Sequence, residues 1–165
     1  MKSFTSTDPV NHQGENTWFT PPLILENLGL FDLDPCSVSF APNFHADVNI
    51  KHDLGECGLN REWRGRVFMN PPYGKEIEPF IKKFKEHDNG IALVFARMGT
   101  KWMQEWLKTD NYIFFFRKRI KFINKDNEYK GNPGSDSCFL ITKNNVQYFE
   151  YYDQEGTLIK CGTII

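Results

Sequence analysis

The sequence predicts a single α/β domain built on a mainly parallel β-sheet, with an antiparallel hairpin at its C-terminal end. The continuous apolar run Ile91–Ala96 is typical of a strand buried on both faces of a parallel sheet. The preceding segment Ile77–Phe84 places apolar side chains at helical spacing. Asp153–Gly156 separates two late β segments as a hairpin turn does. A strand, a helix and a strand in succession favour an α/β fold.

The composition fits one globular domain. The chain has 165 residues, and 20 Lys+Arg against 21 Asp+Glu give a formal net charge of −1. We expect residues 18–165 to fold as one domain, and the polar, aperiodic residues 1–17 to form a flexible arm. The charge neither requires nor excludes a nucleic-acid partner. An aromatic content of 15% is explained equally by stacking on a ring-shaped ligand and by a dense aromatic core.

The cysteines and the hydropathy indicate a cytoplasmic protein outside the membrane. The four cysteines form no C-x-x-C pair and follow no hydrophobic signal segment, so we expect reduced thiols. No apolar run approaches the roughly 20 residues that a membrane helix needs. His45, His52 and Cys57 match no closed zinc site, and we predict no metal. The oligomeric state stays open between a monomer and a weak dimer.

The first predicted element after the arm is a helix. Thr20 is a suitable N-cap residue, and Pro21 and Pro22 suit the first turn. Apolar residues follow at helical spacing until Gly29, which is expected to end the helix.

Three short strands are predicted next. Phe31–Asp34 alternates apolar and acidic residues and ends with Asp34 at its carboxyl tip. His45–Asp53 contains a second strand, which ends at Asp53. Arg66–Met69 is the third, and it precedes the helix that begins near residue 77.

The C-terminal half is predicted to add one helix and four β segments. The apolar face of Trp102–Leu107 indicates the helix. The β segments are Tyr112–Ile123, Cys138–Thr142, Tyr148–Tyr152 and Leu158–Ile165.

The turn Asn70-Pro71-Pro72-Tyr73 has the most distinctive chemistry. A parallel strand before it would deliver Asn70 to the carboxyl edge of the sheet, where open α/β folds bind ligands. Pro71 and Pro72 have a fixed φ and no N–H, so the nearby carbonyls point in fixed directions. The Asn70 side chain adds an acceptor, and Tyr73 adds a flat ring. The turn therefore predicts a pocket for a planar molecule that bears an amino group.

Three ordered motifs resemble those of the amino-group DNA methyltransferases that use S-adenosylmethionine. They are Thr20-Pro21-Pro22, Asp34-Pro35-Cys36-Ser37 and Asn70-Pro71-Pro72-Tyr73. A longer similarity over residues 18–142 is to the short, phage-type, Dam-like DNA N6-adenine methyltransferases, and it includes Trp63-Arg64-Gly65-Arg66 and Thr100-Lys101-Trp102. The order of the motifs is more specific than any one of them.

This resemblance implies a Rossmann-like S-adenosylmethionine-dependent methyltransferase fold that methylates N6 of a flipped adenine in double-stranded DNA. The Asn70 side-chain oxygen and the Pro71 carbonyl would accept the two amine hydrogens. Tyr73 would stack on the extruded base. Thr20 and Pro21 would face the methionine part of the cofactor. The implied setting is phage DNA modification in the cytoplasm of the host cell.

The resemblance also assigns the cofactor end, where this chain departs from larger relatives. Asp34, Pro35 and Cys36 would line the methionine end, but the glycine-rich turn of larger relatives is missing. One strand instead of two lies between this motif and the catalytic turn, which suggests a truncated sheet. Asp53 at the end of that strand is the preferred acid for the cofactor nucleoside, and Asp47 is the second choice.

The densest basic cluster consists of Arg117, Lys118, Arg119 and Lys121. It could track the DNA backbone, and a solvated strand edge explains it equally well. The chain is too short for a separate recognition domain, so the loops 55–63 and 124–137 are the expected readers of a short recognition sequence.

Other functions fit the same motifs. A protein-glutamine N5 methyltransferase needs the same acceptors for an amide nitrogen, and cytosine-N4 methylation is a third possibility. A catalytically silent DNA-binding module that kept the pocket is the alternative outside enzymes.

Overall fold

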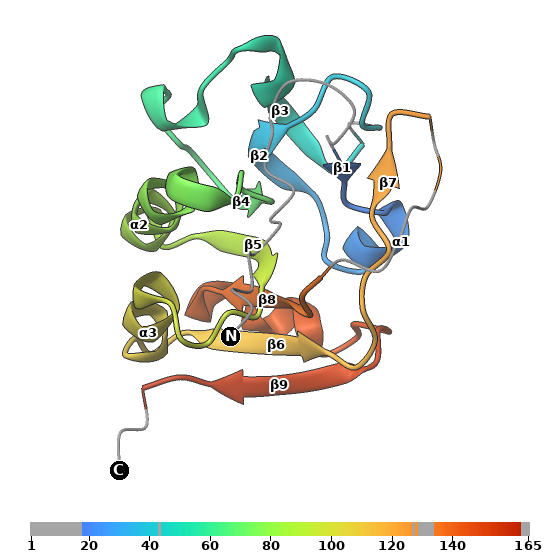
Figure 1. The fold of residues 1–165 in the computed structure, drawn as a ribbon. Coiled ribbons are helices and arrows are strands. Elements are labelled where there is room, and N and C mark those ends of the chain that lie inside the picture. Colours follow the sequence, from blue (N-terminus) through green and yellow to red (C-terminus); the bar gives the residue numbers. More distant parts are fainter. Residues whose placement is uncertain (1–17, 43, 127, 129–133, 163–165) are drawn as a thin grey trace, which may run out of the picture.

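The structure, a computed structural model, describes residues 18–42, 44–126, 128 and 134–162 (Figure 1). The strands are β1 Trp18–Phe19, β2 Phe31–Ser37, β3 Ala46–Lys51, β4 Val67–Met69, β5 Gly90–Phe95, β6 Tyr112–Phe116, β7 Ile123–Asn124, β8 Ser137–Ile141 and β9 Gly156–Lys160. The α-helices are α1 Pro22–Leu25, α2 Ile77–His87 and α3 Lys101–Leu107. Short 3-10 helices are His52–Leu54, Gly58–Asn60, Gly74–Glu76 and Lys143–Phe149. The predicted arm lies outside the described residues.

The central sheet has seven strands in the order β3-β2-β4-β5-β8-β6-β9. The pairs β3/β2, β2/β4 and β4/β5 are parallel, whereas β5/β8, β8/β6 and β6/β9 are antiparallel. Because β8 is antiparallel to both β5 and β6, β6 runs in the same direction as β4 and β5. The predicted mixed α/β architecture is confirmed, but the sheet is less uniformly parallel than we expected. β1 and β7 form a separate two-stranded sheet.

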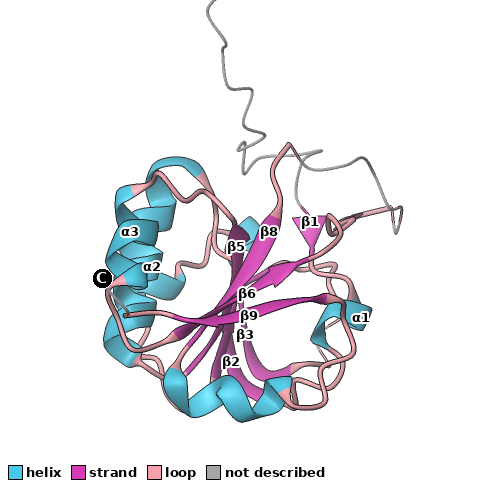
Figure 2. Ribbon diagram, turned by 90° about the horizontal axis from the view of Figure 1, so that it is seen from below, coloured by secondary structure: helices cyan, strands magenta, loops and turns pink. Residues whose placement is uncertain are grey.

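Helical segments cover both faces of the central sheet (Figure 2). α2 and α3 cover one face, where Phe84 and Trp106 are fully buried and stack at 5.7 Å between ring centroids. α1 and the Lys143–Phe149 helix cover the other face, where Leu28 and Phe68 are buried. The predicted helix near residue 77 and the doubly buried strand after it are confirmed as α2 and β5.

The helix predicted after Thr20 is shorter than expected. α1 spans only Pro22–Leu25, and its N-cap is Pro21 rather than Thr20. The Thr20 hydroxyl instead accepts a hydrogen bond from the Asn70 side chain. The prediction of an N-cap at Thr20 is therefore wrong. The predicted end at Gly29 is wrong as well, because the helix stops at Leu25.

The first long strand continues beyond its predicted end. β2 does not stop at Asp34 but runs to Ser37. Its register against β3 shifts between Asp34 and Ser37, and Pro35 lies within this irregular stretch. Proline lacks the N–H that a regular ladder needs, so it is accommodated where the pairing is irregular.

The predicted C-terminal hairpin is also wrong. Tyr148–Tyr152 is not a strand, because the Lys143–Phe149 helix and a turn occupy this stretch. β9 pairs with β6 instead. The rings of Phe149 and Tyr152 lie 5.4 and 5.3 Å from that of Phe114, on the face of the sheet. The aromatic residues that suggested a strand are therefore explained by packing.

Candidate functional site

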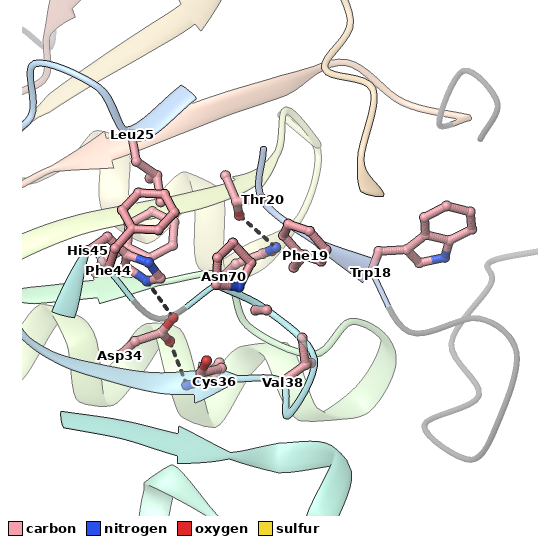
Figure 3. A pocket seen from close by; sticks show the side chains of 14 residues that line it. Trp18, Phe19, Thr20, Leu25, Asp34, Cys36, Val38, Phe44, His45 and Asn70 are labelled. Carbon is pink, nitrogen blue, oxygen red and sulfur yellow. Dashed lines mark hydrogen bonds and ion pairs between the residues drawn. The ribbon is translucent and has the colours of Figure 1, made fainter. Parts of the chain in front are cut away.

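A cavity lies beside the carboxyl-terminal halves of β2 and β4 (Figure 3). It encloses about 370 Å³, including its open mouth. Its aromatic walls are Trp18, Phe19, Phe44 and Phe68, and its polar side chains are Thr20, Asp34, Ser37, His45 and Asn70. The cavity thus brings together residues from all three motifs, which lie up to 50 positions apart in the sequence.

The connection between β2 and β3 leaves room for this cavity. Parallel strands are usually joined by a crossover helix. The described residues of this connection, 38–42 and 44–45, form no helix. Val38, Ala41 and Phe44 from this connection line the cavity directly. The short crossover therefore leaves open a part of the sheet face that a crossover helix would cover.

Asn70 reaches the cavity because it follows β4, whose three residues are all buried. Its Nδ2 donates a hydrogen bond to Thr20 Oγ1 at 3.2 Å (Figure 3). With the amide nitrogen engaged in this way, the Oδ1 atom is the group that remains to accept hydrogen bonds from a ligand. The sequence predicted both residues at the site but not the contact between them.

Asp34 is the acidic group of the cavity, and both of its carboxylate oxygens have a protein partner. Oδ1 accepts the backbone N–H of Cys36 at 2.9 Å, and Oδ2 lies 2.9 Å from His45 Nε2. The side chains of His45 and Asp34 are only 9% and 6% exposed. In the sequence His45 stands out only as a metal candidate, since nothing in its spacing indicates a contact with Asp34.

Cys36 contributes a neutral thiol to the cavity wall. Burial raises its pKa well above the usual value, and the neighbouring Asp34 raises the pKa further. A thiol in such surroundings stays protonated and behaves as a small apolar side chain. Pro21 and Pro35 are also buried, but neither lines the cavity.

Tyr73 lies apart from Asn70, outside the cavity lining. Its ring stacks on Phe95 of β5, with the centroids 4.2 Å apart and the planes at 20°. Burial raises the pKa of its hydroxyl, so the phenol stays neutral. Pro71 and Pro72 are buried between the two residues. The motif therefore presents an amide to the cavity and an aromatic stack toward β5.

The two acids suggested for the cofactor nucleoside lie in different places. Asp53 accepts hydrogen bonds from the backbone N–H and the hydroxyl of Ser39, at 2.8 and 2.5 Å. It therefore holds the β2–β3 connection and does not line the cavity. Asp47 is exposed near the start of β3, where β3 pairs with the first residues of β2. The structure brings neither acid into the cavity.

The predicted basic cluster is exposed and partly paired with acids. Arg117 and Lys118 lie 3.6 and 3.7 Å from the carboxylate of Glu155. Arg119 Nε donates to Asp136 at 2.8 Å. Such surface pairs contribute little stability, so competing anions can displace them.

The basic cluster lies in a loop rather than in the long strand that we predicted. β6 ends at Phe116, and the loop runs through the exposed Lys121 to β7. Because β6 and β4 run in the same direction, this loop and Asn70 both lie at the carboxyl edge of the sheet (Figure 1). Of the two predicted recognition loops, residues 127 and 129–133 lie outside the described residues.

Among the residues that the structure describes, no group of three or more His, Cys, Asp or Glu side chains is arranged to hold a metal ion. None of the described helices has the length and apolar character needed to span a membrane.

The chain also matches a known protein family. A family model described as DNA N-6-adenine-methyltransferase (Dam) matches residues 8–155. No curated protein and no solved structure matches the chain.

Proposed function

Because the chain belongs to the DNA N-6-adenine-methyltransferase (Dam) family, and is therefore a DNA adenine-N6 methyltransferase, we propose that it transfers a methyl group from S-adenosylmethionine to an adenine flipped out of double-stranded DNA. The observation that carries this proposal is the oriented amide of Asn70 at the cavity. The fold is that of a shortened Rossmann-like methyltransferase. The expected setting is phage DNA modification in the host cytoplasm.

Asn70 helps to make the adenine amine nucleophilic. The lone pair of the adenine amine is delocalised into the ring, and acceptors at both N–H groups localise it on the nitrogen. The Asn70 Oδ1 atom and the Pro71 carbonyl take these two roles, with Pro72 fixing the turn. Held by these two acceptors, the N6 lone pair would be free to take up the methyl group that a bound S-adenosylmethionine would supply, and the amine proton would pass to solvent.

The cavity fits the cofactor's cationic methionine end. S-adenosylmethionine supplies an electrophilic methyl group on a positively charged sulfur. The Asp34 carboxylate provides the opposite charge, and the aromatic walls Trp18, Phe19 and Phe44 favour a cation over their faces. The neutral Cys36 thiol adds no second negative charge. Thr20 orients Asn70 from the side, and Pro21 and Pro35 hold the backbone that carries these groups.

Tyr73 receives the flipped base on the ring face opposite Phe95. The existing stack fixes the tyrosine ring, so an adenine would extend the stack to three rings. Stacking on an aromatic side chain stabilises an extruded base by about 1–3 kcal/mol. The base therefore lies between Tyr73 and the acceptors of Asn70 and Pro71.

Asp53 remains our choice for the cofactor nucleoside. An ionised carboxylate has about four acceptor positions, and Ser39 uses two of those of Asp53. The remaining positions can accept ribose hydroxyls at the end of β3. Asp47 is less suited, because it lies near the opposite end of that strand.

The basic loop holds the DNA backbone. Arg117, Lys118 and Arg119 would exchange Glu155 and Asp136 for phosphates, and Lys121 lies exposed in the same loop. Counterion release then makes DNA binding depend on salt.

The test is methyl transfer from S-adenosyl-L-[methyl-³H]methionine to defined acceptors. We expect label in adenine of double-stranded DNA, identified as N6-methyladenine after nuclease digestion. Label in cytosine, or only in the glutamine of a release-factor-like protein, would overturn the proposed substrate. DNA binding without any transfer would indicate a silent binding module.

A further inference from the structure

We infer that His45 is a positioning residue, which holds the Asp34 carboxylate in the orientation that receives the cationic end of the cofactor. This inference rests on the proposed function, because it assumes that S-adenosylmethionine occupies the cavity. It adds a residue that neither the sequence motifs nor the family match assigns. His45 contacts Asp34 in the structure, and its effect on the cofactor passes through that contact.

The His45 ring is held firmly in place. It meets the Phe68 ring in an edge-to-face contact, with the centroids 5.3 Å apart and the planes at 87°. A second edge-to-face contact is made with Phe44, at 6.0 Å and 83°. The backbone is fixed as well, since the His45 carbonyl accepts the N–H of Phe31 at 2.8 Å. Two aromatic neighbours and a backbone hydrogen bond therefore restrict the ring to one orientation relative to Asp34.

The contact determines how the carboxylate is presented. An ionised Asp34 can only accept hydrogen bonds, so His45 Nε2 is the donor at 2.9 Å. Together with the Cys36 N–H on Oδ1, this bond fixes both oxygens of a carboxylate that lines the cavity. Without His45, Oδ2 would be a buried charged atom lacking a donor, which is costly. The carboxylate would then be free to rotate away from its present orientation.

Lys51 is a further charged group near this carboxylate. Burial lowers the pKa of Lys51, and the negative charge of Asp34 opposes this shift without outweighing it. The Lys51 ammonium nevertheless bonds to Ser37 Oγ and to the Val38 carbonyl, at 3.2 and 3.1 Å. Lys51 therefore contributes to the field at Asp34, whereas His45 makes the directional contact.

The experiment compares two replacements of His45 by cofactor titration calorimetry. His45→Phe keeps a ring between Phe44 and Phe68 but removes the donor, and we expect about 10- to 100-fold weaker binding of S-adenosylmethionine. His45→Gln places an amide N–H near the position of Nε2, and we expect affinity within about threefold of the wild type. Equal affinity of His45→Phe and wild type would overturn the inference.

A double-mutant cycle shows whether His45 acts through Asp34. Asp34→Asn weakens cofactor binding by itself, and adding His45→Phe to it should change the affinity by no more than about twofold. Fully additive losses would mean that His45 acts independently, which contradicts the proposal. At saturating cofactor, His45→Phe should keep kcat within about twofold, because Asn70 is unaffected. A loss of kcat with unchanged cofactor affinity would also contradict it.

A third variant and the wild-type measurement cover the remaining outcomes. If His45→Phe does not fold, His45→Asn replaces it, because the asparagine amide is too short to reach the Nε2 position. Weak binding by His45→Asn and near-normal binding by His45→Gln would support the inference, and equal binding by both would overturn it. If the wild-type protein itself binds no S-adenosylmethionine, the proposed cofactor fails, and this outcome is distinct from failure of the His45 assignment.

Discussion

The cavity and the basic loop both lie at the carboxyl edge of the sheet, yet they use charge in opposite ways. In the cavity one acid, Asp34, is buried, and each of its oxygens meets a defined partner. In the basic loop, Arg117 and Lys118 are about 75% and 84% exposed and share one acid, Glu155, at distances beyond a normal hydrogen bond. The first region is pre-organised, and the second is adaptable.

Because of this difference, we expect the cavity to act in the reaction itself and the basic loop to set the affinity for DNA. Buried polar groups with complete hydrogen bonding lose much when one partner is removed. Exposed ion pairs contribute between about 0 and 1 kcal/mol, and salt screens them. Substitutions in and around the cavity should therefore change specific steps of the reaction. Substitutions in the loop should change DNA binding uniformly and in a manner that depends on salt.

The largest effect is expected for Asn70→Ala. It removes the acceptor that activates the amine, so methyl transfer should fall by at least about 10³-fold while the cofactor still binds. Single-turnover transfer assays and calorimetry measure the two properties separately. Gln147→Ala, which removes an exposed amide from the Lys143–Phe149 helix, is the matched control and should retain activity. An active Asn70→Ala enzyme would exclude the acceptor role.

The fold could be predicted wherever the hydrophobic pattern and the burial agree. Ile77–Phe84 and Ile91–Ala96 give clear patterns, and the structure forms α2 and β5 there. The pattern fails at Tyr148–Tyr152, because aromatic residues suit both a strand and a helix packed on a sheet. The position of β9 beside β6 depends on pairs of residues that lie 40 to 48 positions apart in the sequence, from Phe116 with Gly156 to Tyr112 with Lys160. Local pattern carries no information about such a pairing.

The sequence motifs predicted which residues belong to the site but not which contacts they make. Thr20, Asp34 and Asn70 were each identified, and the structure brings them to one cavity. Their partners were not predicted: the Thr20 hydroxyl bonds to Asn70 instead of capping a helix, and His45 reaches Asp34 of β2 from the β2–β3 connection. The second contact depends on that short connection, and no local residue pattern predicts that its described residues form no helix.

The second prediction concerns Tyr73, which joins the cavity region to the base. Tyr73→Ala should lower kcat/KM for DNA by about 100-fold, because it removes the stacking surface and leaves Phe95 without its partner. Tyr73→Phe should retain most of the activity, because the hydroxyl is buried and neutral. Steady-state kinetics with DNA of one sequence provide the measurement. Equal loss in both variants would mean that the hydroxyl, rather than the ring, is required.

The basic loop should show a smaller effect with a different signature. Replacing Arg117 and Arg119 together with Ala should weaken DNA binding about tenfold and reduce the slope of log K against log salt by about 2. Cofactor affinity should not change. Arg64→Ala is the control, since Arg64 pairs with Glu62 just before β4, at the opposite edge of the sheet. An unchanged salt slope in the double variant would remove this loop from the DNA interface.

The smallest effect, and the one that tests pre-organisation most directly, is expected at Thr20. Thr20→Val keeps the shape but removes the oxygen that accepts from Asn70 Nδ2, so the amide can rotate. A net loss of about one hydrogen bond predicts a fall in kcat of about fivefold at saturating cofactor and DNA. Thr20→Ser keeps the hydroxyl and should restore kcat. Wild-type kcat in Thr20→Val would mean that the turn alone orients Asn70, because the proline-locked backbone after it then suffices.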